Sequence, residues 1–272
     1  MILVAGGDSF TYGSELADGV TPHDPMGTEP ARPQVSQSTW PALLAQAYGM
    51  EYQCAAYPGF SNGAIRRTTM NMCERLGDSV GMVVVNWSFP IRYEFRFNYD
   101  TEERWGHWYS INAWTAKDLS DIDDIRKEFK VDNPIILEHH INNIKRAEKT
   151  GINRFAKTFL QHVGSSIHWA TYDSFSNILM LQQYLVSKNI PYLFSMVDEA
   201  LVNNYTEHLT NNESIAVLHK QIDLSRWITL PNGQGFYTWA RDNNYPFGTT
   251  HPLEPAHKDA ALLIKEQYDK LV

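Results

Sequence analysis

The sequence feature that most constrains the fold is a continuous hydrophobic run from Val80 to Val85, which reads Val-Gly-Met-Val-Val-Val. Such a run is typical of a strand that is buried on both faces at the centre of a parallel sheet. Met1 to Ala5 has the same character and ends at Gly6-Gly7, where a tight turn is expected to follow. The sequence therefore predicts two central parallel strands.

Candidate strands and helices alternate along most of the chain. The further strands that we predict are Glu51 to Tyr57 and Pro191 to Val197. The predicted helices run from Ser38 to Tyr48, from Ser61 to Leu76 and from Pro255 to Leu271. Because crossovers between parallel strands place helices on both faces of a sheet, this alternation indicates an α/β protein with a covered parallel sheet.

One segment interrupts this alternation. The chain from Arg92 to Lys188 is predicted to be mostly helical, and its part 92–163 is unusually aromatic. The aromatic residues are Tyr93, Phe95, Phe97, Tyr99, Trp105, Trp108, Tyr109 and Trp114. We interpret 92–163 as an insertion or cap within a single domain of residues 1–272. Its rings suit two roles, a surface for sugars and acyl chains or a packed core.

Composition excludes several classes of protein. The 272 residues are 43% hydrophobic and carry a formal charge of −8, which argues against a nucleic-acid partner. No apolar stretch approaches the roughly 18 residues of a membrane span, and no basic leader precedes the first strand, so we predict a soluble cytoplasmic protein. Two cysteines favour free thiols over a disulfide framework. No cofactor motif is present, and the oligomeric state stays open.

Ser9 and His251 are the candidate catalytic residues. Ser9 follows the first predicted strand, at the sheet edge where open α/β folds bind ligands. His251 precedes the last predicted helix, and Pro252 restricts its backbone. A serine hydroxyl needs a base to become a nucleophile, and histidine is the usual one.

Four motifs in this order resemble the SGNH/GDSL hydrolases. They are Gly7-Asp8-Ser9-Phe10-Thr11-Tyr12-Gly13, Thr39-Trp40-Pro41-Ala42-Leu43-Leu44-Ala45, Ala56-Tyr57-Pro58-Gly59-Phe60-Ser61-Asn62 and His251-Pro252 with His257. The resemblance implies a three-layer α/β/α, flavodoxin-like fold, with Ser9 as nucleophile and His251 as general base. It also implies that the backbone N–H groups of Ser9 and Gly59 bind the oxyanion, and that His257 is structural.

The sequence departs from the family pattern at two positions. The asparagine that normally completes the oxyanion hole is replaced by Ser88, so either Ser88 or Asn86 is the predicted donor. The acid that normally lies three residues before the histidine is replaced by Gly248. A backbone carbonyl could orient His251, or a carboxylate such as Asp242 or Glu254 could do so. The third alternative is a weak or inactive hydrolase that kept the fold.

Two competing motifs are weaker. Gly59-Phe60-Ser61-Asn62-Gly63 matches the Gly-x-Ser-x-Gly elbow of α/β-hydrolases, which would make Ser61 the nucleophile. His139-His140 could suggest a metal, but adjacent helical residues point about 100° apart, so we predict no metal site.

The function predicted from the sequence is hydrolysis of a carboxylic ester through a Ser9 acyl-enzyme. The expected substrate is an acyl or acetyl group on a carbohydrate, a lipid or a small molecule. The alternative is a non-catalytic glycan- or ligand-binding protein, because Gly248 stands where the family has its acid.

Overall fold

The computed structural model describes residues 1–19, 34–97, 108–118, 120, 123, 127 and 134–270. Its main sheet has four parallel strands in the order β2-β1-β3-β6. They are β1 (Ile2–Gly6), β2 (Glu51–Cys54), β3 (Val80–Trp87) and β6 (Tyr192–Met196). All four were predicted to within a few residues, and their order follows the flavodoxin-like pattern.

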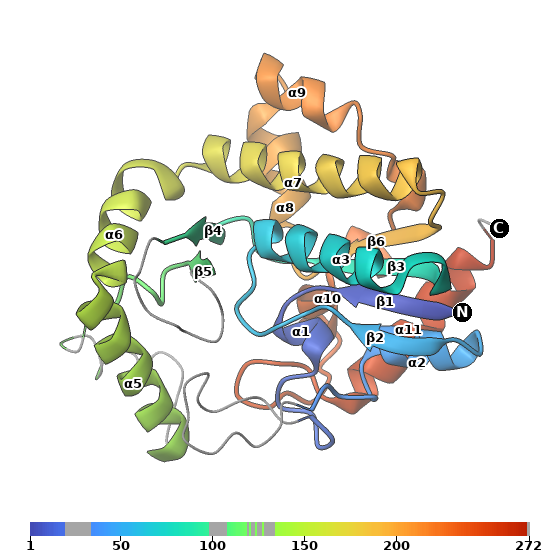
Figure 1. Ribbon diagram of the computed structural model, residues 1–272, viewed down its shortest axis with the longest axis horizontal. Coiled ribbons are helices and arrows are strands. Elements are labelled where there is room, and N and C mark those ends of the chain that lie inside the picture. Colours follow the sequence, from blue (N-terminus) through green and yellow to red (C-terminus); the bar gives the residue numbers. More distant parts are fainter. Residues whose placement is uncertain are drawn as a thin grey trace.

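Helices cover both faces of this sheet, as Figure 1 shows. On one face lie α3 (Asn62–Leu76), α7 (Ile167–Ser187), α8 (Ala200–Asn204) and α9 (Glu213–His219). On the other lie α2 (Trp40–Ala47), α10 (Phe236–Asp242) and α11 (Glu254–Tyr268). The predicted three-layer α/β/α class is therefore confirmed.

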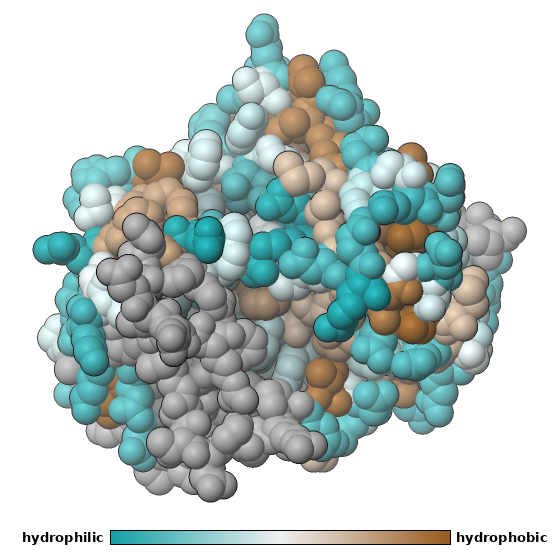
Figure 2. Space-filling view, in the orientation of Figure 1, coloured by the Kyte–Doolittle hydropathy of each residue, from teal (hydrophilic) through white to brown (hydrophobic). Residues whose placement is uncertain are grey.

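The side chains of β3 explain why its sequence does not alternate. Val83, Val85 and Trp87 enter the core beneath α3 and α7, whereas Met82 and Val84 enter the core beneath α2, α10 and α11. A strand between two dry cores must be apolar on both faces. On the outer surface, the face in Figure 2 is mostly hydrophilic, with hydrophobic residues in small separate groups.

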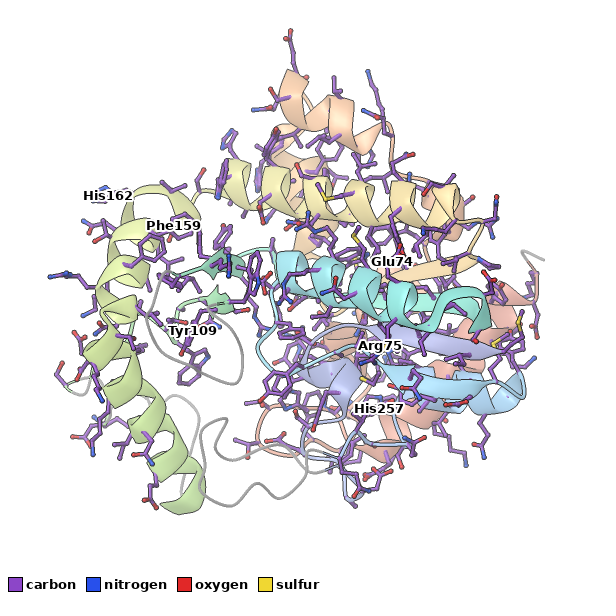
Figure 3. All side chains as sticks on the ribbon, in the orientation of Figure 1. Glu74, Arg75, Tyr109, Phe159, His162 and His257 are labelled. Atoms are coloured by element: carbon purple, nitrogen blue, oxygen red, sulfur yellow. The ribbon has the colours of Figure 1, made fainter. Side chains whose placement is uncertain are left out.

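The aromatic segment is more than a helical insertion. It contains α5 (Pro134–Thr150) and α6 (Ile152–Phe159), but also the antiparallel strands β4 (Tyr93–Arg96) and β5 (Trp108–Ile111). The helical prediction was wrong for these strands. In β4, Tyr-Glu-Phe-Arg alternates aromatic and charged side chains, and this period of two places the rings on one face of a strand. Tyr109 and Phe159, labelled in Figure 3, both pack on the small core of the insertion.

Several of the predicted rings are thus structural. Phe95, Phe97 and Tyr109 pack against that core, while Trp108 is 39% exposed. Tyr99 and Trp105 lie outside the described residues. Among the residues that the structure does describe, no helix is both long and apolar enough to cross a membrane.

The interface between α3 and α7 contains a carboxyl group that opposes stability at neutral pH. Burial raises the pKa of Asp173 from 3.8 to about 6, although the Arg66 charge and a hydrogen bond from Asn177 act to lower it. Because the pKa of Asp173 is raised in the folded state, its protonated carboxyl group contributes fully to stability below pH 3.8, and this contribution is lost as pH rises through 6.

We therefore expect Asp173→Asn to be more stable than the wild type above pH 6, by on the order of 1–3 kcal/mol. Near pH 3.5 the two proteins should unfold at nearly the same temperature, because the Asp173 carboxyl group is then mostly protonated in the folded and in the unfolded state. Thermal unfolding followed by circular dichroism at pH 3.5 and 7.5 measures both differences. A variant that is less stable at pH 7.5 would mean that the attraction of Arg66 exceeds the cost of burial.

Candidate active site

Ser9 lies at the carboxyl edge of the main sheet, immediately after β1. Asp8 caps the short helix α1 (Ser9–Tyr12), and its Oδ1 atom accepts a hydrogen bond of 3.1 Å from the backbone N–H of Phe10. Ser9 is the first residue of that helix and is 7% exposed. The turn predicted at Gly6-Gly7 thus delivers the serine to the edge where ligands bind in this class of fold.

His251 meets Ser9 across 242 residues of sequence. The Ser9 hydroxyl donates to His251 Nε2 at 2.8 Å. The ring of Phe10 packs against the imidazole, with centroids 4.7 Å apart. A tight turn carries the histidine, in which the Gly248 N–H donates to the His251 carbonyl at 2.9 Å. The structure therefore brings together the two residues that the sequence singled out.

Glu15 holds the other side of the imidazole. Its Oε2 atom is 3.1 Å from His251 Nδ1, and it accepts from the backbone N–H groups of His251 at 2.9 Å and Thr250 at 3.0 Å. Because the Glu15 carboxylate can only accept, Nδ1 carries the ring proton and donates it toward Glu15, which leaves Nε2 of the neutral ring to accept from Ser9. The Thr250 hydroxyl lies 2.9 Å from the same nitrogen. The side chains of Ser9, His251 and Glu15 thus form a continuous chain of contacts, in the order that a serine–histidine–acid triad would require.

Gly248 stands where the family pattern has an acid, and the Glu15 side chain lies against it. A Cβ atom at this position would lie 2.7 Å from Glu15 Oε2 and 3.0 Å from Glu15 Cδ. The space that an acid three residues before His251 would enter is therefore filled by a carboxylate from a different loop. Glu15 also adopts a left-handed backbone, with φ of 70°. L-residues rarely adopt that conformation, and it occurs disproportionately at functional sites.

The Glu15 carboxyl group is ionised throughout the neutral range. Burial acts to raise its pKa, but the hydrogen bond from the His251 ring, those from the Thr250 and His251 backbones, and the charge of His251 together lower it from 4.5 to about 2. An anion beside Nδ1 stabilises the imidazolium that forms when His251 takes a proton.

The two acids proposed from the sequence lie in other contacts. Glu254 Oε1 accepts from the Ala17 N–H at 2.8 Å. Asp242 accepts from Gln234 Nε2 at 2.7 Å and from Arg241 Nε at 3.0 Å. Within the described ranges neither carboxylate hydrogen-bonds to His251. Nor is a backbone carbonyl the partner of Nδ1, which faces the side chains of Glu15 and Thr250.

The backbone N–H groups of Ser9 and Gly59, predicted from the sequence to bind an oxyanion, lie at one edge of the sheet. Ser9 follows β1, and Gly59 follows the adjacent parallel strand β2, so both lie at the same edge of the sheet. Gly59 occupies a turn closed by a 3.2 Å hydrogen bond from the Phe60 N–H to the Tyr57 carbonyl, and its φ of 81° after Pro58 fits a type II turn. Neither the Ser9 nor the Gly59 N–H has an acceptor among the described residues.

The two side chains predicted to complete the oxyanion hole are differently placed. The Ser88 hydroxyl donates to Asp8 Oδ2 at 2.6 Å. Asn86 is fully buried on the face of β3 that also carries Met82 and Val84, and its amide has no partner in the described part of the chain. The Ser88 hydroxyl therefore already donates its proton to Asp8, and the Asn86 amide is not exposed to solvent.

Ser61 does not form a nucleophile elbow. It is fully buried, and its hydroxyl accepts from the Ala64 N–H at 3.2 Å as the cap of α3. His257 is structural, as expected: burial lowers its pKa to about 3, and its Nδ1 accepts from the Trp40 N–H at 3.1 Å. No group of His, Cys, Asp and Glu in the described residues could hold a metal ion. The side chains of His139 and His140 lie outside those residues.

Comparison with known proteins finds likeness only at the level of structure. No protein-family model matches the sequence, and no curated protein matches it. One similar structure is a carbohydrate esterase family 2 enzyme with a carbohydrate-binding domain from Corynascus thermopiles (Myceliophthora fergusii). It is 12% identical with a TM-score of 0.45, and the match covers 99% of this chain and 66% of the other.

Two further structures show the same degree of similarity. An acetyl xylan esterase from the rumen bacterium Butyrivibrio proteoclasticus is 14% identical with a TM-score of 0.43, over 99% of this chain and 64% of that one. A carbohydrate esterase whose active site displays divergent catalytic and non-catalytic binding functions is 14% identical with a TM-score of 0.41, over 97% and 67%. The chain thus spans about two thirds of the length of these proteins. Similarity at this level assigns neither family nor activity, so the functional inference rests on Ser9, His251 and Glu15.

Proposed function

We propose that this protein is a serine hydrolase that cleaves carboxylic esters through an acyl-enzyme on Ser9. The observation that carries the proposal is the continuous chain of contacts from Ser9 Oγ to His251 Nε2, at 2.8 Å, and from His251 Nδ1 to Glu15, at 3.1 Å. A nucleophile, a base within hydrogen-bond reach and a third group that orients the base are the parts that nucleophilic catalysis requires.

Acylation follows from this geometry. His251 Nε2 takes the proton of the Ser9 hydroxyl as Oγ bonds to the carbonyl carbon of the ester. The carbonyl oxygen becomes an oxyanion, which the N–H groups of Ser9 and Gly59 stabilise. The imidazolium then gives its proton to the departing alkoxide as the ester C–O bond breaks. The alcohol leaves, and the acyl group remains on Ser9.

Deacylation repeats these steps with water. His251 takes a proton from a water molecule, whose oxygen attacks the acyl carbon. When the second tetrahedral intermediate collapses, the bond to Oγ breaks and Ser9 recovers a proton from His251. The products are a carboxylic acid and the free enzyme. The substrate class that we propose is an acyl or acetyl ester of a carbohydrate, a lipid or a small molecule.

The alternative of a non-catalytic glycan- or ligand-binding protein was motivated by the missing acid at position 248. Glu15 fills that space and contacts the imidazole, which favours hydrolysis. Phe95, Phe97 and Tyr109 are partly buried against the core of the insertion, so their rings are only in part available to a glycan.

A fluorophosphonate probe tests the proposal directly, because it phosphonylates activated serines. We expect the native protein to be labelled at Ser9, and Ser9→Ala to show no labelling. Ser61→Ala is the matched control: it removes another buried serine hydroxyl near the site, costs about 1 kcal/mol as a lost helix cap, and should still be labelled. A folded wild type that resists the probe, or labelling that persists in Ser9→Ala, would overturn the proposal.

A further inference from the structure

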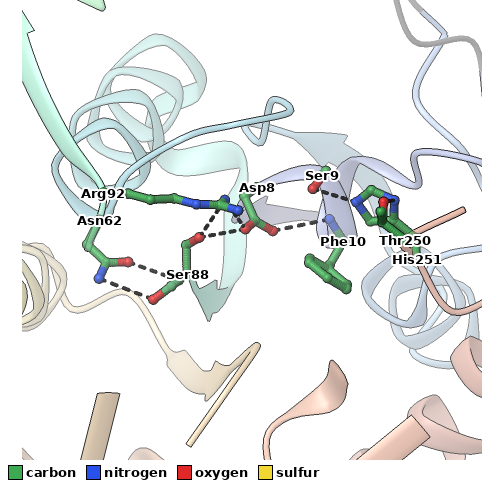
Figure 4. A network of polar contacts seen from close by, with 8 residues as sticks. All are labelled: Asp8, Ser9, Phe10, Asn62, Ser88, Arg92, Thr250 and His251. Carbon is green, nitrogen blue, oxygen red and sulfur yellow. Dashed lines mark hydrogen bonds and ion pairs between the residues drawn. The ribbon is translucent and has the colours of Figure 1, made fainter. Parts of the chain in front are cut away.

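Arg92 contacts Asp8, the residue before the proposed nucleophile, and is absent from the motifs that predicted the site. Its Nη1 atom donates to Asp8 Oδ2 at 2.9 Å and to Ser88 Oγ at 3.0 Å. Asp8 precedes Ser9 in the chain, and its other oxygen holds the N–H of Phe10. Figure 4 shows the guanidinium reaching toward Asp8 on the side where Ser9 lies. One carboxylate thus ties Arg92 to the first turn of α1.

The hydrogen bonds of Ser88 show that its hydroxyl is not free to donate to a substrate. A hydroxyl has a single proton, and an arginine side chain has no acceptor. The proton of Ser88 therefore goes to Asp8 at 2.6 Å, and its oxygen accepts from Arg92. Asn62 fixes the backbone of Ser88, since its Oδ1 accepts from the Ser88 N–H at 2.9 Å. The side chain in the place of the family's asparagine thus supports Arg92.

Three of the N–H groups of Arg92 are available to a ligand. Of its five N–H bonds, the two on Nη1 serve Asp8 and Ser88. The Nε–H and the two N–H bonds of Nη2 have no acceptor among the described residues. The guanidinium carbon lies 4.8 Å from the centre of the Phe89 ring, which fixes the plane of the group. The side chain is 19% exposed, so it remains open to a ligand.

The electrostatic setting suits a group that binds an oxyanion. The Asp8 side chain is fully buried and forms an ion pair with Arg92, so the guanidinium is held in place before any substrate arrives. A preorganised donor gives the most stabilisation where negative charge develops, and a charged donor forms a stronger hydrogen bond than an amide. Asp8 offsets the positive charge and so limits its repulsion of the His251 imidazolium.

We infer that Arg92 is the side-chain donor of the oxyanion hole, in place of the asparagine of the SGNH pattern. This inference rests on the proposed ester hydrolysis. A free N–H of Arg92 donates to the carbonyl oxygen as Ser9 attacks, together with the backbone N–H groups of Ser9 and Gly59. Arg92 is then a catalytic residue, and Ser88, Asp8 and Asn62 position it.

The test compares Arg92→Gln with Ser88→Ala on a neutral ester. Removing one oxyanion donor lowers kcat by about 10²–10³ in other serine hydrolases, and we expect Arg92→Gln to do so with KM within a few-fold. Ser88→Ala removes one of the two acceptors of Nη1, so it should lower kcat too, but only about tenfold, because the ion pair with Asp8 still holds the guanidinium. Arg92→Gln also leaves Asp8 without its cation, so Asp8→Asn/Arg92→Gln, which removes both charges, provides a second variant that should fold and lose about as much kcat as Arg92→Gln.

Two readouts distinguish donation from mere support of the fold. The affinity for an aryl boronic acid, which forms a tetrahedral anion on the serine, should fall in parallel with kcat/KM. Added guanidinium should restore part of kcat in Arg92→Ala but not in Ser9→Ala. Folded Arg92 variants with normal kcat would overturn the inference, as would an equal loss in Ser88→Ala or a loss confined to KM for negatively charged esters.

The same experiment separates this inference from the proposed function. A wild type that the fluorophosphonate probe labels, with Arg92 variants that turn over at its rate, overturns only the role of Arg92. A folded wild type that is neither labelled nor active overturns the proposed hydrolysis and the role of Arg92 with it.

Discussion

Glu15→Gln is expected to lower kcat by about 10³–10⁴ while KM changes little. A comparable loss follows removal of the charge of the orienting acid in a serine protease. The amide retains the size of the carboxylate but cannot stabilise the imidazolium, and its NH₂ group can turn toward Nδ1 and favour the wrong tautomer. The effect should therefore fall on the chemical step and leave substrate binding intact.

Steady-state hydrolysis of a neutral aryl ester at pH 7.5 measures this effect. Glu254→Gln is the matched control, because Glu254 is a nearby carboxylate that also accepts a backbone N–H, from Ala17. Its kcat should stay within about threefold of the wild type, and circular dichroism should show both variants folded. If Glu15→Gln keeps its rate, the Thr250 hydroxyl alone orients His251 and the site is a dyad.

The main sheet could be predicted from the sequence because each strand has a local signature. Val80–Trp87 has no polar side chain except that of Asn86, and Ile2–Gly6 ends in a glycine turn. The strands β4 and β5 were missed because their aromatic residues were attributed to a helical cap. The alternation in Tyr93–Arg96 is a strand signal, but it is only four residues long, and the pairing of Tyr93 with Ile111 and of Arg96 with Trp108 establishes both strands.

The site could be predicted only in part, for a related reason. Ser9 and His251 lie in recognisable motifs, whereas Glu15 meets His251 across 236 residues through a left-handed backbone that its own sequence does not indicate. Arg92 is likewise joined to Asp8 across 84 residues. The one local signal was negative, the glycine at position 248, and it could not reveal which loop supplies the acid.

The close approach of Gly248 to Glu15 predicts that the acid can be transferred from position 15 to position 248. In Glu15→Gly the carboxylate is gone, and glycine tolerates the φ of 70° at this position. A side chain at position 248 would then extend into the vacated space, since its Cβ points to where Glu15 Oε2 lies. Position 248 itself is outside the left-handed region, so an aspartate fits its backbone.

We expect Gly248→Asp to have opposite effects in the two backgrounds. In the wild type it should lower kcat, because its Cβ alone would lie 2.7 Å from Glu15 Oε2 and two carboxylates would compete for one imidazole. In Glu15→Gly it should raise kcat on the order of 10²-fold, because it restores an anion beside Nδ1. Four kcat values, for the wild type, the two single variants and the double variant, form a double-mutant cycle that measures this coupling.

The sign of the coupling decides the interpretation. If the two substitutions act independently, Gly248→Asp lowers kcat by the same factor in both backgrounds, and Gly248 is then required for the turn that carries His251 rather than for room. If Gly248→Asp lowers kcat in the wild type but raises it in Glu15→Gly, Glu15 and an acid at position 248 are alternative solutions to one geometric requirement. A carboxylate at the Nδ1 side of His251 would then be what the site needs, whichever loop provides it.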